Sequence, residues 1–174
     1  MKICIDPGHG GIDPGAVGND PMVLTEKEVN LSVSLFLRDI LEGKGHAVVM
    51  TRKMDRSLSL GGRSRFANRT GAELFVSVHC NSAANSSASG IETWIYPESV
   101  DGRFYAEKVQ GGLVAAFPDH RDRGVKSANY HVLRETEMPA ILVECEFLSN
   151  PVQLQFLAEE SNRLQIAAAI GEAI

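Results

Sequence analysis

The sequence lacks the features that define several large classes of protein. Only 3 of its 174 residues are cysteine. They cannot all pair and none stands in a Cys-x-x-Cys motif, so we interpret Cys4, Cys80 and Cys145 as small buried hydrophobic side chains. Basic residues are fewer than acidic ones, 17 against 22, and the resulting net charge of -5 argues against nucleic acid as a partner.

Long apolar runs are also missing. A membrane-spanning helix needs about 20 consecutive apolar residues, and no run in this chain approaches that length. The N-terminus enters a strand-like run directly, without the charged and apolar leader of a signal peptide. We therefore expect no membrane span, and we expect the chain to be exported as part of a longer precursor or released by lysis.

What the sequence does contain is an alternation of short apolar runs with amphipathic segments. Its length, with 44% hydrophobic and 22% charged residues, predicts one globular domain spanning residues 1–174. The alternation is a βαβ rhythm, which predicts an α/β fold with a mainly parallel sheet. The predicted strands are residues 2–5, 47–50, 74–78, 91–96 and 139–147, and the predicted helices are residues 25–41, 59–69, 103–117 and 150–174.

Three local patterns are weaker. Residues 132–134 form a short strand candidate, and the charged segment 119–124 is typical of solvated surface. The last helical region has a predicted break near Ser161.

The start of the first helix has a clearer signal. Thr25 is predicted to cap this helix, with Glu28 completing a capping box.

His9 follows the first predicted strand, among glycines. Pro7 stops ladder hydrogen bonding, and Gly8 and Gly10 allow the backbone to approach a ligand closely. A lone histidine here is more often a turn residue without a role. The glycines do not form a dinucleotide-binding loop, because Asp13 stands where the third glycine of that motif belongs.

A second histidine and two glutamates have similar positions. His79 and Glu144 each come late in an apolar run. Glu26 lies in the first turn of a predicted helix, where an acidic residue taken alone more often only complements the helix dipole. Carboxyl ends of parallel strands share one edge of the sheet, so these side chains can face one cleft with His9. Cys80 remains a less favoured metal ligand, because it would point to the opposite face from His79.

Two imidazoles and a carboxylate are the ligand set of several catalytic zinc sites. A zinc ion lowers the pKa of bound water, and a neighbouring carboxylate can then take the proton. This division of roles gives His9, Glu26 and His79 as zinc ligands and Glu144 as general base. From spacing alone the signal is moderate, because no His-Glu-x-x-His motif and no nucleophile elbow is present.

Four motifs stand in order along the chain: residues 6–11 (DPGHGG), 26–31 (EKEVNL), 77–81 (SVHCN) and 138–150 (MPAILVECEFLSN). Together they resemble the zinc-dependent N-acetylmuramoyl-L-alanine amidases of the Amidase_3 family. Shorter similarities at residues 64–68 and 129–134 lie between them, so that the resemblance spans nearly the whole chain.

The resemblance implies a fold, a cofactor and a reaction. The fold would be a three-layer domain with a twisted sheet of about six strands and helices on both faces. One zinc ion would be held by His9, Glu26 and His79, with Glu144 as the essential acidic residue. The reaction would be hydrolysis of the amide between N-acetylmuramic acid and L-alanine in peptidoglycan of the bacterial cell wall. We expect a monomer, and an acidic surface with little attraction to an anionic wall.

The chain departs from the family pattern at two positions. Cys80 replaces a small residue such as alanine, which predicts harmless packing. Glu146 stands where glycine is common and shares a predicted strand face with Glu144, so that it either raises the pKa of Glu144 or is merely exposed. The polar loop at residues 81–90 is too short for a helical insertion that covers the metal, so we expect an open cleft that needs no activator.

Two other classes of function remain open from the sequence. A zinc carboxypeptidase or deacetylase would use the same chemistry on another amide. A wall-binding module could keep the fold without the activity, although the presence of all four candidate residues argues against it.

Overall fold

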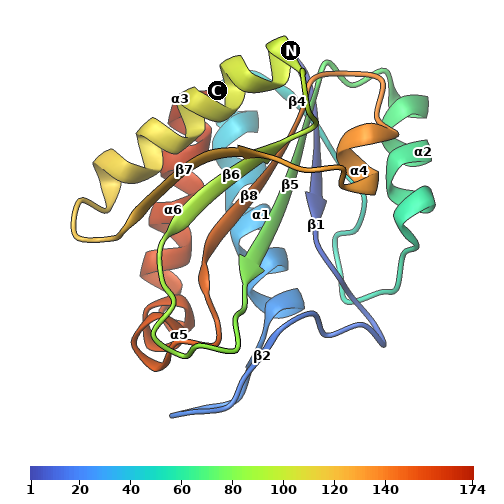
Figure 1. Cartoon of the computed structure of the whole chain (residues 1–174). Coiled ribbons are helices and arrows are strands. Elements are labelled where there is room, and N and C mark those ends of the chain that lie inside the picture. The colour runs from blue at the N-terminus through green and yellow to red at the C-terminus, as the bar shows by residue number, and fades with distance from the viewer.

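The fold is a three-layer α/β arrangement around one mainly parallel sheet (Figure 1). The structure is a computed structural model that describes residues 1–174. The sheet has 6 strands in the order β4-β1-β5-β8-β6-β7. The strands are β1 (Lys2–Pro7), β4 (Ala47–Met50), β5 (Leu74–Asn81), β6 (Ile91–Ile95), β7 (Asp122–Ser127) and β8 (Ala140–Phe147). The predicted fold class is confirmed.

Strand direction divides the sheet. β4, β1, β5 and β8 run parallel to one another, whereas β6 pairs antiparallel with β8 and parallel with β7. The C-terminal ends of β1, β5 and β8 therefore share one edge of the sheet, as predicted for the candidate site. Between β1 and the first helix, the two-residue strands β2 (Val17–Gly18) and β3 (Leu24–Thr25) form a small hairpin that the sequence did not predict.

Helices cover both faces of the sheet (Figure 1). The larger core lies on one face, where β-strand side chains pack with α1, α3, α5 and α6. The smaller core lies on the other face with α2 and α4. The helices are α1 (Glu26–Gly43), α2 (Leu60–Thr70), α3 (Val100–Ala116), α4 (His131–Arg134), α5 (Pro151–Ala158) and α6 (Glu160–Ala173). No helix is both long and apolar enough to cross a membrane.

Helix α1 begins as the sequence predicts. Its capping box is present, with the Glu28 carboxylate accepting from the Thr25 backbone N–H at 3.1 Å. Such a box satisfies N–H groups that have no partner inside the helix. It therefore fixes the position of the first helical residue, Glu26.

Two predictions of local structure were wrong. Residues 132–134 belong to helix α4, not to a strand, because the Tyr130 carbonyl accepts the N–H groups of Leu133 and Arg134 at 3.1 and 3.0 Å. The charged segment 119–124 is not only surface, because β7 begins within it at Asp122. β7 is an edge strand whose half-buried, charged side chains lack the apolar alternation of a typical strand. The predicted helix break lies at Glu159, two residues before Ser161.

Candidate metal centre

His9 lies in the loop that follows β1 and is held there in an uncommon conformation. Its φ is 60°, a left-handed value that costs a non-glycine residue free energy. The Arg63 side chain donates to the His9 carbonyl at 2.7 Å, which helps to hold this conformation. The His9 Nδ1 atom lies 2.8 Å from an Asp13 carboxylate oxygen, so that this contact orients the ring and leaves Nε2 free to bind a ligand.

Two arginines donate hydrogen bonds to backbone carbonyl groups at the start of this loop. Arg63 also donates to the Pro7 carbonyl at 2.7 Å, while Arg52 donates to the Pro7 and Gly8 carbonyls, both at 2.9 Å. Both arginines are nearly inaccessible to solvent, with relative exposures of 3% and 2%. Burial and the charge of Arg63 lower the pKa of Arg52 to about 10, so Arg52 stays protonated at neutral pH. Charged donors therefore hold the loop that carries His9, in addition to backbone hydrogen bonds such as that from the Gly8 N–H to the Val78 carbonyl at 2.9 Å.

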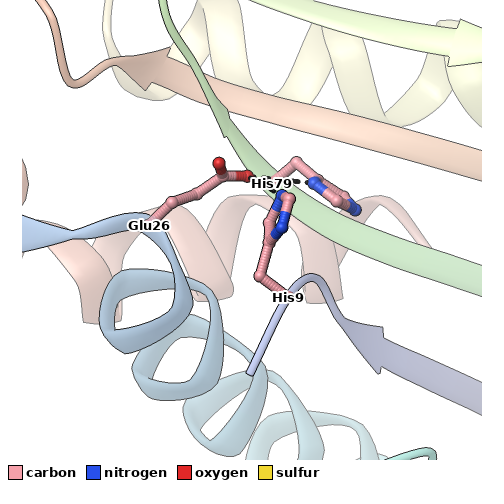
Figure 2. A group of neighbouring side chains, drawn as sticks. All are labelled: His9, Glu26 and His79. Carbon is pink, nitrogen blue, oxygen red and sulfur yellow. Dashed lines mark hydrogen bonds and ion pairs between the residues drawn. The ribbon is translucent and has the colours of Figure 1, made fainter. Parts of the chain in front are cut away.

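Glu26 is the first residue of α1, and its carboxylate is buried among donors. Oε2 accepts from the Ala16 N–H at 2.8 Å, and Oε1 accepts from the Cys80 N–H at 3.1 Å and from Asn30 Nδ2 at 3.3 Å. A role limited to the helix dipole would leave this side chain in solvent, but it is only 4% exposed and points toward both histidines (Figure 2).

His79 stands late in β5, on the face that is turned toward the first loop. Its Nδ1 atom lies 3.0 Å from Glu26 Oε1, and the same oxygen lies 3.2 Å from His9 Nε2. A Cβ atom at Gly8 would come within 2.3 Å of the His79 ring, and one at Gly15 within 2.5 Å of Glu26 Oε2. The absence of a side chain at Gly8 and Gly15 therefore leaves room for the side chains of His79 and Glu26.

The three side chains suit a metal ion. Each offers one ligand atom, and these atoms all lie within 4.8 Å of one another (Figure 2). The hydrogen bond to Glu26 raises the pKa of His9 to about 9, against the opposing effect of burial. Burial disfavours ionisation of Glu26, but the two histidines outweigh it and lower its pKa. A positive charge is thus favoured beside the Glu26 carboxylate, and a divalent cation would supply it in place of the proton on His9.

Glu144 faces the same space from β8. It is paired in register with His79, and both residues line a cleft of about 500 Å³ together with His9. Burial, together with the negative charges of Glu26 and Glu92, raises the pKa of Glu144 to about 7 despite the nearby histidines. Its Oε2 atom is buried without a hydrogen-bond partner. A carboxyl group with a pKa near neutrality can both accept and return a proton.

Glu146 differs from the prediction. It does not lie exposed, because its relative exposure is 0%. A register shift between β5 and β8 separates it from Glu144, and it accepts from the Gly90 and Phe147 N–H groups at 2.8 and 3.0 Å. His120 contacts its other oxygen at 2.9 Å. Glu146 is therefore a structural carboxylate that joins β8 to the segments before β6 and β7.

Cys80 faces away from the cleft, as its position after His79 predicts. It is 3% exposed, belongs to the larger hydrophobic core and lies beside Cys145. Burial raises its pKa well above the usual value for a thiol. All three cysteines are buried and free, which confirms their interpretation as core residues.

Several residues around the site were not found from the sequence. Asn30 follows Glu26 by four positions on α1, a spacing that places both on one helix face and could have indicated their contact. Asp13 lies four residues after His9 in the same loop. Tyr130 lines the cleft and falls within the similarity at residues 129–134, but it was given no role. Arg52 and Arg63 carry no such signal, because only the fold brings them to the first loop.

Fold and site together define a class of protein. A parallel α/β sheet with two histidines and a glutamate gathered at one edge, and a second glutamate in the same cleft, is an arrangement suited to metal-dependent hydrolysis. The family model for N-acetylmuramoyl-L-alanine amidase, Amidase_3, matches residues 3–174. The chain belongs to this family.

Curated relatives agree with this family. The chain is 39% identical over 173 residues to the sporulation-specific N-acetylmuramoyl-L-alanine amidase of Bacillus subtilis, covering 98% of the chain and 62% of that protein. It is 41% identical over 152 residues to the amidase CwlM of Bacillus licheniformis, covering 86% of the chain and 58% of that protein. The chain thus spans about three fifths of the length of these two relatives.

Solved structures share the fold closely. An N-acetylmuramoyl-L-alanine amidase from Clostridium difficile 630 superposes with a TM-score of 0.93 at 38% identity, covering 99% of this chain and 93% of that one. The CwlD amidase from Clostridioides difficile, solved in complex with the GerS lipoprotein, gives a TM-score of 0.94 at 31% identity, covering 99% and 95%.

Proposed function

We propose that the chain is a zinc-dependent amidase that hydrolyses the bond between N-acetylmuramic acid and the L-alanine of the stem peptide in peptidoglycan. Membership of the family supports the reaction. The observation that carries the mechanism is the convergence of His9, Glu26 and His79 beside a cleft that Glu144 lines together with both histidines. We further propose that residues 1–174 form one catalytic domain.

Zinc fits this ligand set because two neutral imidazoles and one carboxylate bind it and leave a position for water. A zinc ion supplies two effects in such sites, a lowered pKa of the bound water toward about 7 and polarisation of the substrate carbonyl. Asp13 holds the His9 ring in position through Nδ1, and the Ala16 and Cys80 N–H groups hold the Glu26 carboxylate. These contacts fix the ligands before any ion binds.

Glu144 carries the proton in this proposal. It accepts one proton from the attacking water and delivers a proton to the amide nitrogen as the carbon–nitrogen bond breaks. The products are the lactyl carboxylate of N-acetylmuramic acid and a stem peptide with a free amine. Burial and the negative charges of Glu26 and Glu92 favour the protonated form of Glu144, so that it can return the proton at neutral pH.

The chain is expected to act on the bacterial cell wall as a monomer and without an activator. No helix or strand forms between Ser82 and Gly90, and the cleft beside His79 is open to solvent. CwlD was solved with a lipoprotein partner, so activator independence needs a direct test. The purified chain alone should release stem peptides.

Metal analysis and mass spectrometry of digested peptidoglycan test the proposal together. We expect about one zinc ion per chain and intact stem peptides released from the glycan. Loss of a terminal amino acid or of acetate would instead identify a carboxypeptidase or a deacetylase. Zinc-loaded protein that binds peptidoglycan without any covalent change to it would identify a binding module and overturn the proposal.

A further inference from the structure

A second groove lies beside the cleft, and cations line it. It has a volume of about 760 Å³ and runs between the chain that follows β4 and the outer face of α2. Its five basic side chains are Arg52, Lys53, Arg56, Arg65 and Arg69, and no aspartate or glutamate lines it. In a protein of net charge -5 with 17 basic residues, such a concentration of one sign needs an explanation.

The four exposed cations of this basic groove have no acidic partner. Eight of the basic side chains outside the groove pair with carboxylates, among them Lys27 with Asp55 and Arg123 with Glu92. No such pair involves Lys53, Arg56, Arg65 or Arg69, although all four are exposed. Even Asp55, which stands between Met54 and Arg56 in the sequence, directs its carboxylate to Lys27.

Unpaired like charges around one groove repel one another, and a bound anion relieves that repulsion. Arginine is suited to this role, because its planar guanidinium group can hold both oxygens of a carboxylate or phosphate. Arg65 and Arg69 lie four residues apart on α2, so their side chains project from the same helix face. Apolar side chains of Met54 and Phe66 complete the lining and suit the carbon atoms of an organic ligand.

The basic groove adjoins the candidate active site. Leu58 lines both the groove and the cleft that holds His9, His79 and Glu144. A ligand extended across Leu58 can therefore occupy both at once. The cleft itself is lined by three carboxylates, Asp6, Asp13 and Glu144, and by one arginine, Arg63, which pairs with Asp6, so an anionic portion of a substrate is better accommodated on the groove side.

We propose that the basic groove binds the carboxylates of the stem peptide while the amide at the head of that peptide lies in the cleft. This inference rests on the proposed function, which supplies a substrate with an acidic peptide on one side of the scissile bond. That peptide carries carboxylates on its D-glutamate residue and at its C-terminus, whereas the sugar side carries none near the bond. Arg65 and Arg69 thereby select for stem peptides whose carboxylates are free rather than amidated.

Equilibrium binding tests the proposal independently of catalysis. The probes are a free L-alanyl-D-glutamyl stem pentapeptide and the same peptide with its carboxylates amidated, each titrated into the zinc-loaded chain by calorimetry. The free peptide should bind about tenfold more tightly than the amidated one, and added salt should reduce that difference. The variant Arg65→Gln/Arg69→Gln should bind both peptides equally.

A matched control removes the same charge elsewhere. Arg38→Gln/Arg103→Gln changes the partly exposed Arg38 and the exposed Arg103, which pair with Asp39 and Glu107 outside the basic groove. It should keep the preference for the free peptide, as the unchanged chain does. The same loss of preference in both double variants would show a nonspecific charge effect and overturn the proposal.

Two further results would overturn it. One is equal affinity of the unchanged chain for the free and amidated peptides. The other is that a poly(glycerol phosphate) binds through Arg65 and Arg69 while the peptide preference is absent, which would make the groove an anchor for a wall polymer. Because the pentapeptide is not hydrolysed, failure of the amidase reaction would leave these binding results intact and interpretable.

Discussion

Glu144 and Glu146 stand two residues apart on β8, yet their surroundings are different. Glu144 lies where β8 still pairs in register with β5, opposite His79, and one of its oxygens is buried without a partner. Glu146 lies beyond the register shift, fully buried, with both oxygens occupied by donors. Hydrogen-bond partners, and not residue type or burial alone, decide which carboxylate is available for proton transfer.

A third carboxylate sharpens this contrast. Glu92 on β6 is the register partner of Glu144, and it is 2% exposed. Asn81 and Trp94 donate to it at 2.7 and 3.1 Å, and Arg123 and Lys126 form ion pairs with it. Burial opposes its ionisation, but the two cations outweigh that effect and lower its pKa. Neighbouring strands thus present one glutamate with a raised pKa and one with a lowered pKa.

The largest expected effect concerns Glu144. Glu144→Gln should lower kcat by about 10²–10⁴-fold, because the variant cannot accept the proton, while zinc content stays that of the unchanged chain. Muropeptide hydrolysis and metal analysis measure the two quantities. His79→Ala is the matched variant across the strand pair and should lose both zinc and turnover. Unchanged hydrolysis by Glu144→Gln would remove Glu144 from the role of base.

Glu146 should behave in the opposite way. Glu146→Gln places an amide N–H₂ against donors and should cost about 3 kcal/mol of unfolding free energy, while folded protein keeps its zinc and turnover. Urea unfolding followed by circular dichroism gives the stability, and the muropeptide assay gives the activity. If Glu146→Gln instead abolished turnover at unchanged stability, Glu146 would be the catalytic carboxylate and Glu144 the structural one.

Glu92 should give a smaller and pH-dependent effect. Its folded pKa lies below its unfolded value of about 4.3, so ionised Glu92 stabilises the fold above that pH. This stabilisation disappears as the pH falls through the folded pKa. Glu92→Gln should therefore cost about 1–2 kcal/mol at pH 7, because water also reaches Arg123 and Lys126. The difference in urea midpoint between the unchanged chain and Glu92→Gln should narrow below about pH 5. A difference that widened as the pH fell would contradict the stabilising role of ionised Glu92.

The smallest effect is expected on the far face of β5. Cys80→Ala removes only a sulfur atom from the larger core and should cost about 1 kcal/mol, with zinc content unchanged. Thermal unfolding and metal analysis measure both. A loss of zinc in Cys80→Ala would show that the alternation between His79 and Cys80 does not separate the cleft from the core.

Much of the site could be predicted because its residues stand at ends of regular elements. His9 follows a strand, His79 comes late in another, and Glu26 follows a recognisable cap, so local patterns gave their places. Strand β7 could not be predicted, since an edge strand of half-buried charged residues has no apolar periodicity. The prediction of a strand at residues 132–134, which belong to α4, was wrong for a related reason. Two buried apolar residues fit either a strand or a turn of helix.

Net charge was also a poor guide to the surface. An acidic chain suggested little attraction for anions, but 5 of its basic residues line one groove. The groove is assembled from the segment after β4 and from α2, and only one face of that helix contributes to it. A sum over the whole chain cannot show how charges are distributed over a folded surface.

The sequence by itself determined the α/β class, the strand that precedes His9, the strands that carry His79 and Glu144, and the helix cap that fixes Glu26. These follow from local periodicity and from the chemistry of caps and turns, which act over a few residues. Only the tertiary structure decided that one oxygen of Glu144 has no hydrogen-bond partner, whereas both oxygens of Glu146 and of Glu92 accept from donors. That outcome depends on a register shift and on side chains from distant segments, since protonation is set by whatever the fold places within a few ångströms.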